Sequence, residues 1–112
     1  MEKFIQYLDE RIEASKAEIE ALEAAGRQDD AVFAKVRLNI YDVCKTVTGV
    51  HLKPTGGGVN AIKSMLERFR TQWGEALQKA QAHGDVKNIA VEETKLAALA
   101  DVIARFTEAA GI

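Results

Sequence analysis

The chain has 112 residues, a single cysteine and a formal net charge of −2. This length suits one domain that buries its own core without disulfides or a structural metal. The weak negative charge excludes a basic surface for nucleic acid, and the lone Cys44 excludes an intrachain disulfide and suits a reducing compartment. The sequence shows neither a signal peptide nor an apolar run of about 18 residues that could span a membrane. We therefore expect a cytoplasmic protein without a nucleic-acid or membrane partner.

Residues 2–25 carry large apolar side chains three and four positions apart, a spacing that predicts an amphipathic helix. Gly26 follows where a left-handed residue can end that helix, and Asp29 or Asp30 can cap the next one. The turn sequence at 25–31 resembles the helix–helix turn of tetratricopeptide repeats, and this resemblance implies a tight turn and nothing beyond it. A second helix is predicted over 31–48, antiparallel to the first.

The second predicted helix is apolar on more than one side. Its main stripe is predicted to face the core and consists of Phe33, Val36, Ile40, Val43, Cys44 and Val47. At about 100° per residue, Ala31, Ala34 and Leu38 fall on the opposite side. This second apolar face is predicted to lie at the surface.

Residues 49–59 contain the only proline, Pro54, and the run from Gly56 to Gly58, so they are predicted to form a loop. Further helices are predicted over 60–82 and 86–109. His83 and Gly84 end the first of these, and Asp85 or Asn88 can cap the second. The last helix also has a second apolar line, formed by Val91, Ala98 and Val102.

These segments predict an all-α protein. It is a single-domain, antiparallel up-down-up-down four-helix bundle of two helical hairpins, at 2–48 and 60–109, joined by the glycine-rich loop 49–59. The net charges are −4 for 1–26, +2 for 27–53, +2 for 54–83 and −2 for 84–112. Helices that follow one another within a hairpin therefore attract each other, each exposed pair contributing less than about 1 kcal/mol.

The usual motifs of catalysis and cofactor binding do not occur. The run from Gly56 to Gly58 precedes Lys63 and Ser64, but a phosphate-binding loop needs glycine before the lysine, where this chain has Ile62. No Glu-x-x-His motif is present to hold paired iron in a bundle. We therefore predict no metal, no cofactor and no catalytic residue, with Cys44 packed in the core.

Glu92 is the polar residue that fits the pattern least, because it falls on the apolar stripe of the last helix, with Glu93 at the edge. A carboxylate facing the core needs a partner, and Arg37 or Tyr41 on the second helix can serve. The sequence leaves two interpretations open. Either Glu92 lies at the boundary of the core, or Glu92, Glu93, Arg37 and Tyr41 form a buried polar cluster.

The function predicted from these features is a non-enzymatic helical interaction module that associates with itself as a homodimer, or with another protein. Its predicted interface is formed by the second apolar faces and consists of Ala31, Ala34, Leu38, Val91, Ala98 and Val102. One alternative is a bundle that binds a small ligand in a pocket beside Trp73. The other is an enzyme that uses the polar cluster around Glu92.

Overall fold

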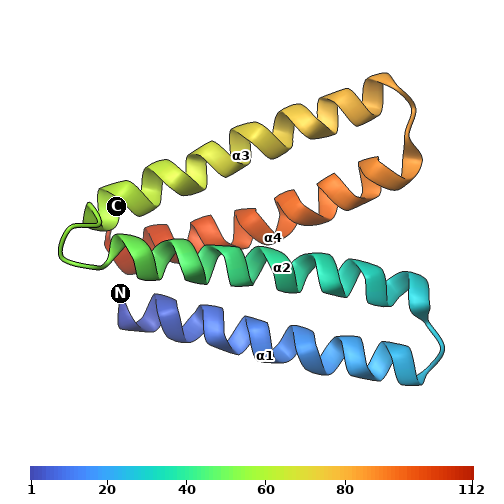
Figure 1. The fold of residues 1–112 in the computed structure, drawn as a ribbon, viewed down its shortest axis with the longest axis horizontal. Coiled ribbons are helices and arrows are strands. Elements are labelled where there is room, and N and C mark those ends of the chain that lie inside the picture. The colour runs from blue at the N-terminus through green and yellow to red at the C-terminus, as the bar shows by residue number, and fades with distance from the viewer.

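The computed structural model describes all residues from 1 to 112 and contains four α-helices. These are α1 (Glu2–Ala24), α2 (Gln28–His51), α3 (Gly58–Ala82) and α4 (Val86–Ala110). The predicted all-α four-helix bundle is confirmed. Figure 1 shows that consecutive helices run in opposite directions, so α1 pairs with α2 and α3 pairs with α4.

Both hairpin turns are closed by the same backbone chemistry. Gly26 and Gly84 have φ values of 74° and 63°, a left-handed conformation that glycine adopts without steric cost. The next residue in each turn donates its N–H five positions back, from Arg27 to Leu22 at 2.9 Å and from Asp85 to Ala80 at 3.0 Å. This pattern satisfies carbonyls that would otherwise be free at the helix end, so the predicted glycine stops are confirmed.

The two helix caps differ. Asp85 caps α4 as predicted, because its carboxylate accepts from the Asn88 backbone N–H at 3.2 Å. The predicted cap of α2 is wrong, since that helix begins at Gln28 and has no side-chain cap. Asp30 instead forms an exposed ion pair with Arg27 at 2.7 Å.

The loop between the hairpins is shorter than predicted. Helix α2 continues through Gly49 to His51, and α3 begins at Gly58, which leaves residues 52–57 as the connection. Glycine inside a helix costs about 1 kcal/mol, which tertiary packing offsets here because Cys44 and Thr48 are buried in the preceding turn. The His51 Nδ1 donates to the Gly56 carbonyl at 2.7 Å and folds the loop back on the helix end.

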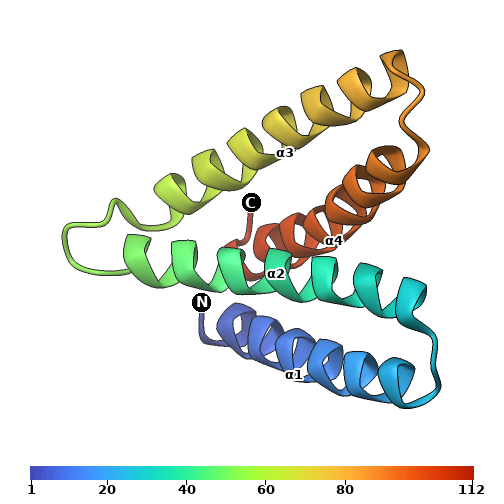
Figure 2. The same cartoon turned by 45° about the vertical axis from the view of Figure 1, so that its right-hand side comes forward.

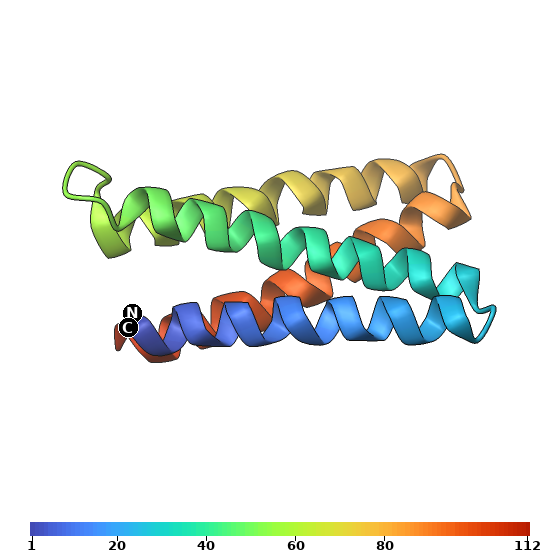
Figure 3. The same ribbon diagram turned by 60° about the horizontal axis from the view of Figure 1, so that its bottom comes forward.

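The core lies at the end of the bundle that holds both chain termini and the loop 52–57, and Figure 3 shows the termini side by side there. Phe4 and Phe106 meet edge to face in it, with ring centroids 5.5 Å apart. Each fully buried large apolar side chain contributes about 1.5–3 kcal/mol to the free energy of folding, relative to an exposed one. The largest are Phe4, Phe106, Leu8, Ile40, Ile62, Leu66, Leu99 and Val102. Toward the two tight turns the buried residues are smaller, namely Ser15, Ala31, Ala34 and Ala80.

The bundle opens toward those two turns. Figures 1 and 2 show the α3–α4 hairpin diverging from the α1–α2 hairpin as it approaches Gly84. The molecule measures 44 × 35 × 21 Å, whereas four helices packed in a square would be about 20 Å across in both directions. Its radius of gyration is 15.1 Å, against about 13 Å for a compact chain of this length. The bundle is therefore a wedge, closed at the core end.

The helix contacts follow from this shape. Helices α2 and α4 touch each other in the middle, whereas α1 and α3 lie on opposite sides and do not touch. No helix combines the length and the hydropathy that crossing a membrane requires.

Candidate functional site

Helix α1 packs mainly on α2 and also contacts α4, and α3 packs mainly on α4 and also contacts α2. Helices α1 and α4 border a groove over α2, along which lie cavities lined mainly by polar side chains.

The groove between α1 and α4 contains a polar network. The Tyr7 hydroxyl donates a hydrogen bond to the Asp101 carboxylate, which joins α1 to α4. The Arg11 Nη2 donates to the Tyr41 hydroxyl at 3.4 Å, and its guanidinium lies 5.2 Å from the centre of the Tyr41 ring. Arg105 lies at the same distance over the ring of Tyr7.

The electrostatics of this network suit a structural role. Burial, followed by the hydrogen bond to Asp101, raises the pKa of the Tyr7 phenol well above its usual value. The hydrogen bond to Tyr41 raises the pKa of the Arg11 guanidinium. Tyr7 therefore stays neutral and Arg11 stays charged at physiological pH, so neither exchanges a proton there. The arrangement fixes α1 against α4 and α2.

The structure does not bring the four residues of the predicted polar cluster together. Glu92 is half-buried, with one oxygen 3.3 Å from the Lys95 Nζ and the other without a partner, so it lies at the core boundary. Tyr41 bonds to Arg11 instead. Arg37 pairs with Glu18 of α1 at 2.6 Å.

Only Arg37 and Glu93 share a site, which is a cavity of about 580 Å³ between α1, α2 and α4 at the open end of the wedge. Two exposed or half-exposed ion pairs line it, Glu18 with Arg37 and Arg27 with Asp30. Most of its charges are therefore already partnered within the chain. No group of three or more His, Cys, Asp or Glu side chains is placed to hold a metal ion.

The residues of the predicted interface lie inside the chain. Ala31 and Ala34 are buried against α1, and Ala98 and Val102 are buried in the core, each less than 5% exposed. Leu38 and Val91 are half-buried, and Leu38 packs against the core. The prediction for α2 is therefore only partly right: Ile40 and Cys44 of the predicted core stripe are buried in the core, but Ala31 and Ala34, which were predicted to lie at the surface, are buried as well.

An exposed apolar surface runs instead along the other side of α2. It comprises Asp29, Val32, Val36, Asn39, Val43, Thr46 and Val50, and we call it the outer stripe of α2. Val32 is 43% exposed and Val50 50% exposed, while Val36 and Val43 are half-buried and lie outside the core cluster. The stripe contains a hollow of about 360 Å³, lined by Asn39, Asp42, Val43, Thr46 and Val47.

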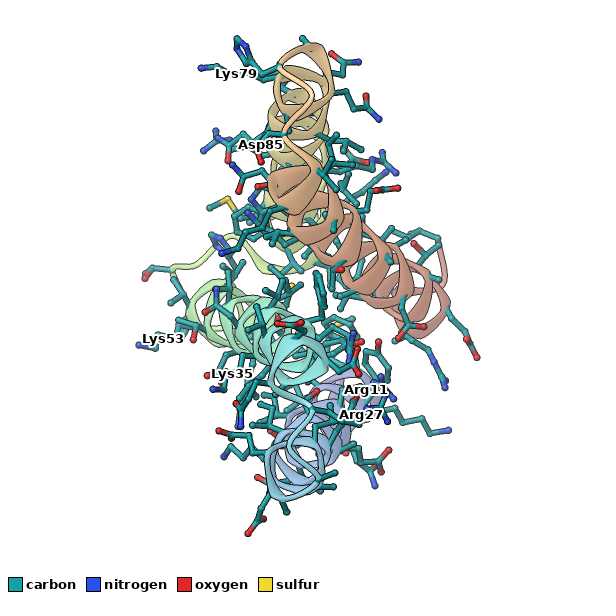
Figure 4. The ribbon with its side chains drawn as sticks, turned by 90° about the vertical axis from the view of Figure 1, so that its right-hand side faces the viewer. Arg11, Arg27, Lys35, Lys53, Lys79 and Asp85 are labelled. Carbon is teal, nitrogen blue, oxygen red and sulfur yellow. The ribbon has the colours of Figure 1, made fainter.

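The wedge shape explains this exposure. Helix α3 approaches α2 only at the loop end and then diverges, so it does not cover the valines in the first half of α2. Figure 4 places Lys35 on the side of α2 that faces away from α4, opposite to Arg11. The sequence carried a signal for this surface, since Val36, Val43 and Val50 recur every seven positions.

A further cavity of about 330 Å³ lies between α3 and α4. Its wall is apolar, formed by Leu96, Leu99, Ala100, Ile103 and Ala104, with Arg70 at the edge. Trp73 does not line it, because its ring stacks on Phe69 at 5.0 Å and carries Lys95 at 5.2 Å from the ring centre. The pocket predicted beside Trp73 is thus filled by these neighbours.

No protein-family model matches this chain, and comparison with curated proteins and with solved structures yields no significant match.

Proposed function

We propose that this protein is a non-enzymatic helical interaction module that associates with a second copy of itself through the outer stripe of α2. The observation that carries the proposal is the row of valines on an uncovered helix face. Single exposed apolar residues are normal on a soluble protein, but a continuous apolar face usually marks an interaction surface. Val32, Val36, Val43 and Val50 share one side of the helix, where they form an apolar row that Asn39 and Thr46 interrupt.

The openness of the wedge supports the same function. Only 18 of the 112 residues are buried, and the second half of α3 contributes only Ala80 to them. A partner that covers α2 beside α3 removes this apolar surface from water. Each Å² of apolar surface buried in this way contributes about 25 cal/mol to the free energy of association. The free energy of association comes mainly from that burial.

Light scattering over a concentration series tests the proposal. We expect the weight-average mass to rise from the 12.3 kDa of one chain toward twice that value as the concentration increases from micromolar to millimolar. Val43→Glu places a charge in the centre of the stripe, so the variant is expected to remain monomeric over the same range.

The matched control is Ala17→Glu, which adds the same charge to an exposed position on α1 and is expected to leave association unchanged. Circular dichroism checks that both variants keep the helical content of the parent chain. A parent chain whose mass stays at that of the monomer throughout the series contradicts self-association.

A further inference from the structure

We propose that two copies pair through α2 in an antiparallel orientation, around a two-fold axis that passes between positions 37 and 38. This proposal rests on the proposed self-association and adds its geometry. It makes the outer stripe of α2 the seam of a short coiled coil between the two copies. The pairing would be isologous, with the same surface used by each chain.

The spacing of the stripe has the form of a heptad seam. Val36, Val43 and Val50 repeat every seven residues after Asp29, and Asn39 and Thr46 repeat every seven residues after Val32. The steps between successive members alternate between three and four. The core contacts of this helix use other side chains, including Ile40, Tyr41 and Cys44, so the heptad seam lies outside the core cluster of the monomer.

Polarity along the seam favours the antiparallel orientation. A parallel pair in register would set Asp29 directly against Asp29 of the second copy, which is a like-charge contact. The antiparallel pair sets Asp29 opposite Thr46, whose hydroxyl can donate to the carboxylate. It also sets Val32 opposite Val43 and Val36 opposite Asn39. The polar members of the seam, Asp29, Asn39 and Thr46, specify its register at some cost in stability.

Charge beside the seam supports the same register. Asp42 forms no ion pair within its own chain, although it lines the hollow next to Val43. Lys35 lies seven positions earlier on the same flank and contacts Glu23 only loosely, at 3.6 Å with both side chains largely exposed. In the antiparallel pair Asp42 is level with position 33 of the second copy, so Lys35 of that copy lies about 3 Å further along the helix, within reach of the Asp42 carboxylate. The two-fold axis creates this contact twice.

The available area is sufficient for a specific dimer. In this register residues 28–47 of the two α2 helices overlap, a length of about 30 Å, and Val50 lies beyond the overlap. With a face about 20 Å wide this gives roughly 600 Å² per copy, at the lower end of what each partner contributes to a specific interface. Figure 1 shows no other helix in front of α2 on this side.

Disulfide trapping tests the orientation. Val32→Cys and Val43→Cys are prepared as separate chains, each in a Cys44→Ala background so that the native thiol does not interfere. In the antiparallel pair position 32 faces position 43 of the second copy, whereas identical positions are about 16 Å apart along the helix. A disulfide needs Cα atoms within about 7 Å. We expect oxidation to cross-link the mixture of the two chains but neither chain alone.

The outcomes separate this proposal from the one on which it rests. Cross-linking of each single variant with itself would mean parallel pairing and overturn the antiparallel geometry. A dimer detected by light scattering without any cross-linked mixture would place the interface elsewhere, which overturns the inference but leaves self-association standing. A mass that stays at that of one chain in light scattering would contradict both the antiparallel geometry and self-association itself.

Charge reversal provides a second, independent test. Lys35→Glu and Asp42→Lys each replace two attractive contacts in the dimer by repulsive ones, so each is expected to weaken dimerisation about tenfold. The double variant restores the attraction and should recover the affinity of the parent chain. The control is Glu20→Lys, on an exposed part of α1, which should leave the dimerisation affinity of the parent chain unchanged. Single variants that dimerise like the parent would overturn the proposed pairing of Lys35 with Asp42.

Discussion

Two buried residues show how the interior controls protonation. Cys44 is completely buried on α2, and that burial raises the pKa of its thiol to about 12. The thiolate is the reactive form of cysteine, so Cys44 behaves as a small apolar side chain, as its place in the sequence pattern predicted. Tyr7 is held neutral in the same way, with the Asp101 carboxylate as its acceptor.

Tyr7 therefore makes stability depend on alkaline pH. Because its pKa is raised in the folded state above the value of about 10 in the unfolded chain, the stabilisation is complete below about pH 10 and is lost as the pH rises further. We expect the free energy of unfolding of Tyr7→Phe to fall less steeply between about pH 9 and 11 than that of the parent. At neutral pH the variant should be less stable by about 1 kcal/mol, through loss of the hydrogen bond.

Denaturant titrations at several pH values provide the measurement. Cys44 is present in both chains, so its contribution above about pH 9 cancels in the comparison. Equal slopes for the two proteins would show that Tyr7 titrates normally in the folded state.

At the level of elements, the sequence predicted the helices well and their orientations less well. Apolar spacing and the glycines at 26 and 84 located all four helices to within a few residues. Helix α2 has two apolar faces, and periodicity alone does not say which one a neighbour covers. Ala31 and Ala34 are fully buried on α2, the helix that has its most extensive contacts with α1, whereas the larger Val36 and Val43 lie outside the core cluster.

The polar residues were harder to place for a related reason. Tyr7 and Asp101 are 94 positions apart, so no local pattern connects them. The neighbour of Glu92 is Lys95, one turn away on α4, and neither of the two partners predicted on the second helix contacts it. The outer stripe of α2 was missed because Val36 and Val43 were assigned to the core stripe, whereas both are half-buried and lie outside the core cluster.

Helix α4 begins with a side-chain cap, whereas α2 begins without one. Asp85→Ala removes the side chain that accepts from the free N–H of Asn88, so it is expected to destabilise the protein by about 1 kcal/mol. Asp29→Ala, at the uncapped start of α2, is expected to change stability by less than about 0.5 kcal/mol. Thermal unfolding at a concentration where the chain is monomeric measures both. Equal losses for the two variants would contradict the assigned caps.

At the scale of the whole molecule, stability is concentrated at one end. The large buried side chains gather near the chain termini and the loop 52–57, whereas small residues fill the interior toward Gly26 and Gly84. Local opening costs little where few apolar contacts must break. The two hairpins are therefore held together mainly by the core end of the wedge.

Amide hydrogen exchange of the monomer should show this gradient. We expect the slowest exchange at Ile40–Cys44 and Leu99–Val102, which lie in the core, and exchange faster by at least an order of magnitude in the helical turns next to Gly26 and Gly84. Mass spectrometry of proteolytic fragments resolves these segments. Uniform protection along all four helices would mean that the open end is as stable as the core.

The wedge shape also determines how large the protein appears in solution. A radius of gyration of 15.1 Å belongs to a compact chain about 1.4 times as long as this one. A single copy would thus leave a sizing column between the positions of a compact monomer and a compact dimer. Elution volume alone would suggest partial association where there is none, so the number of chains per particle has to be determined from mass.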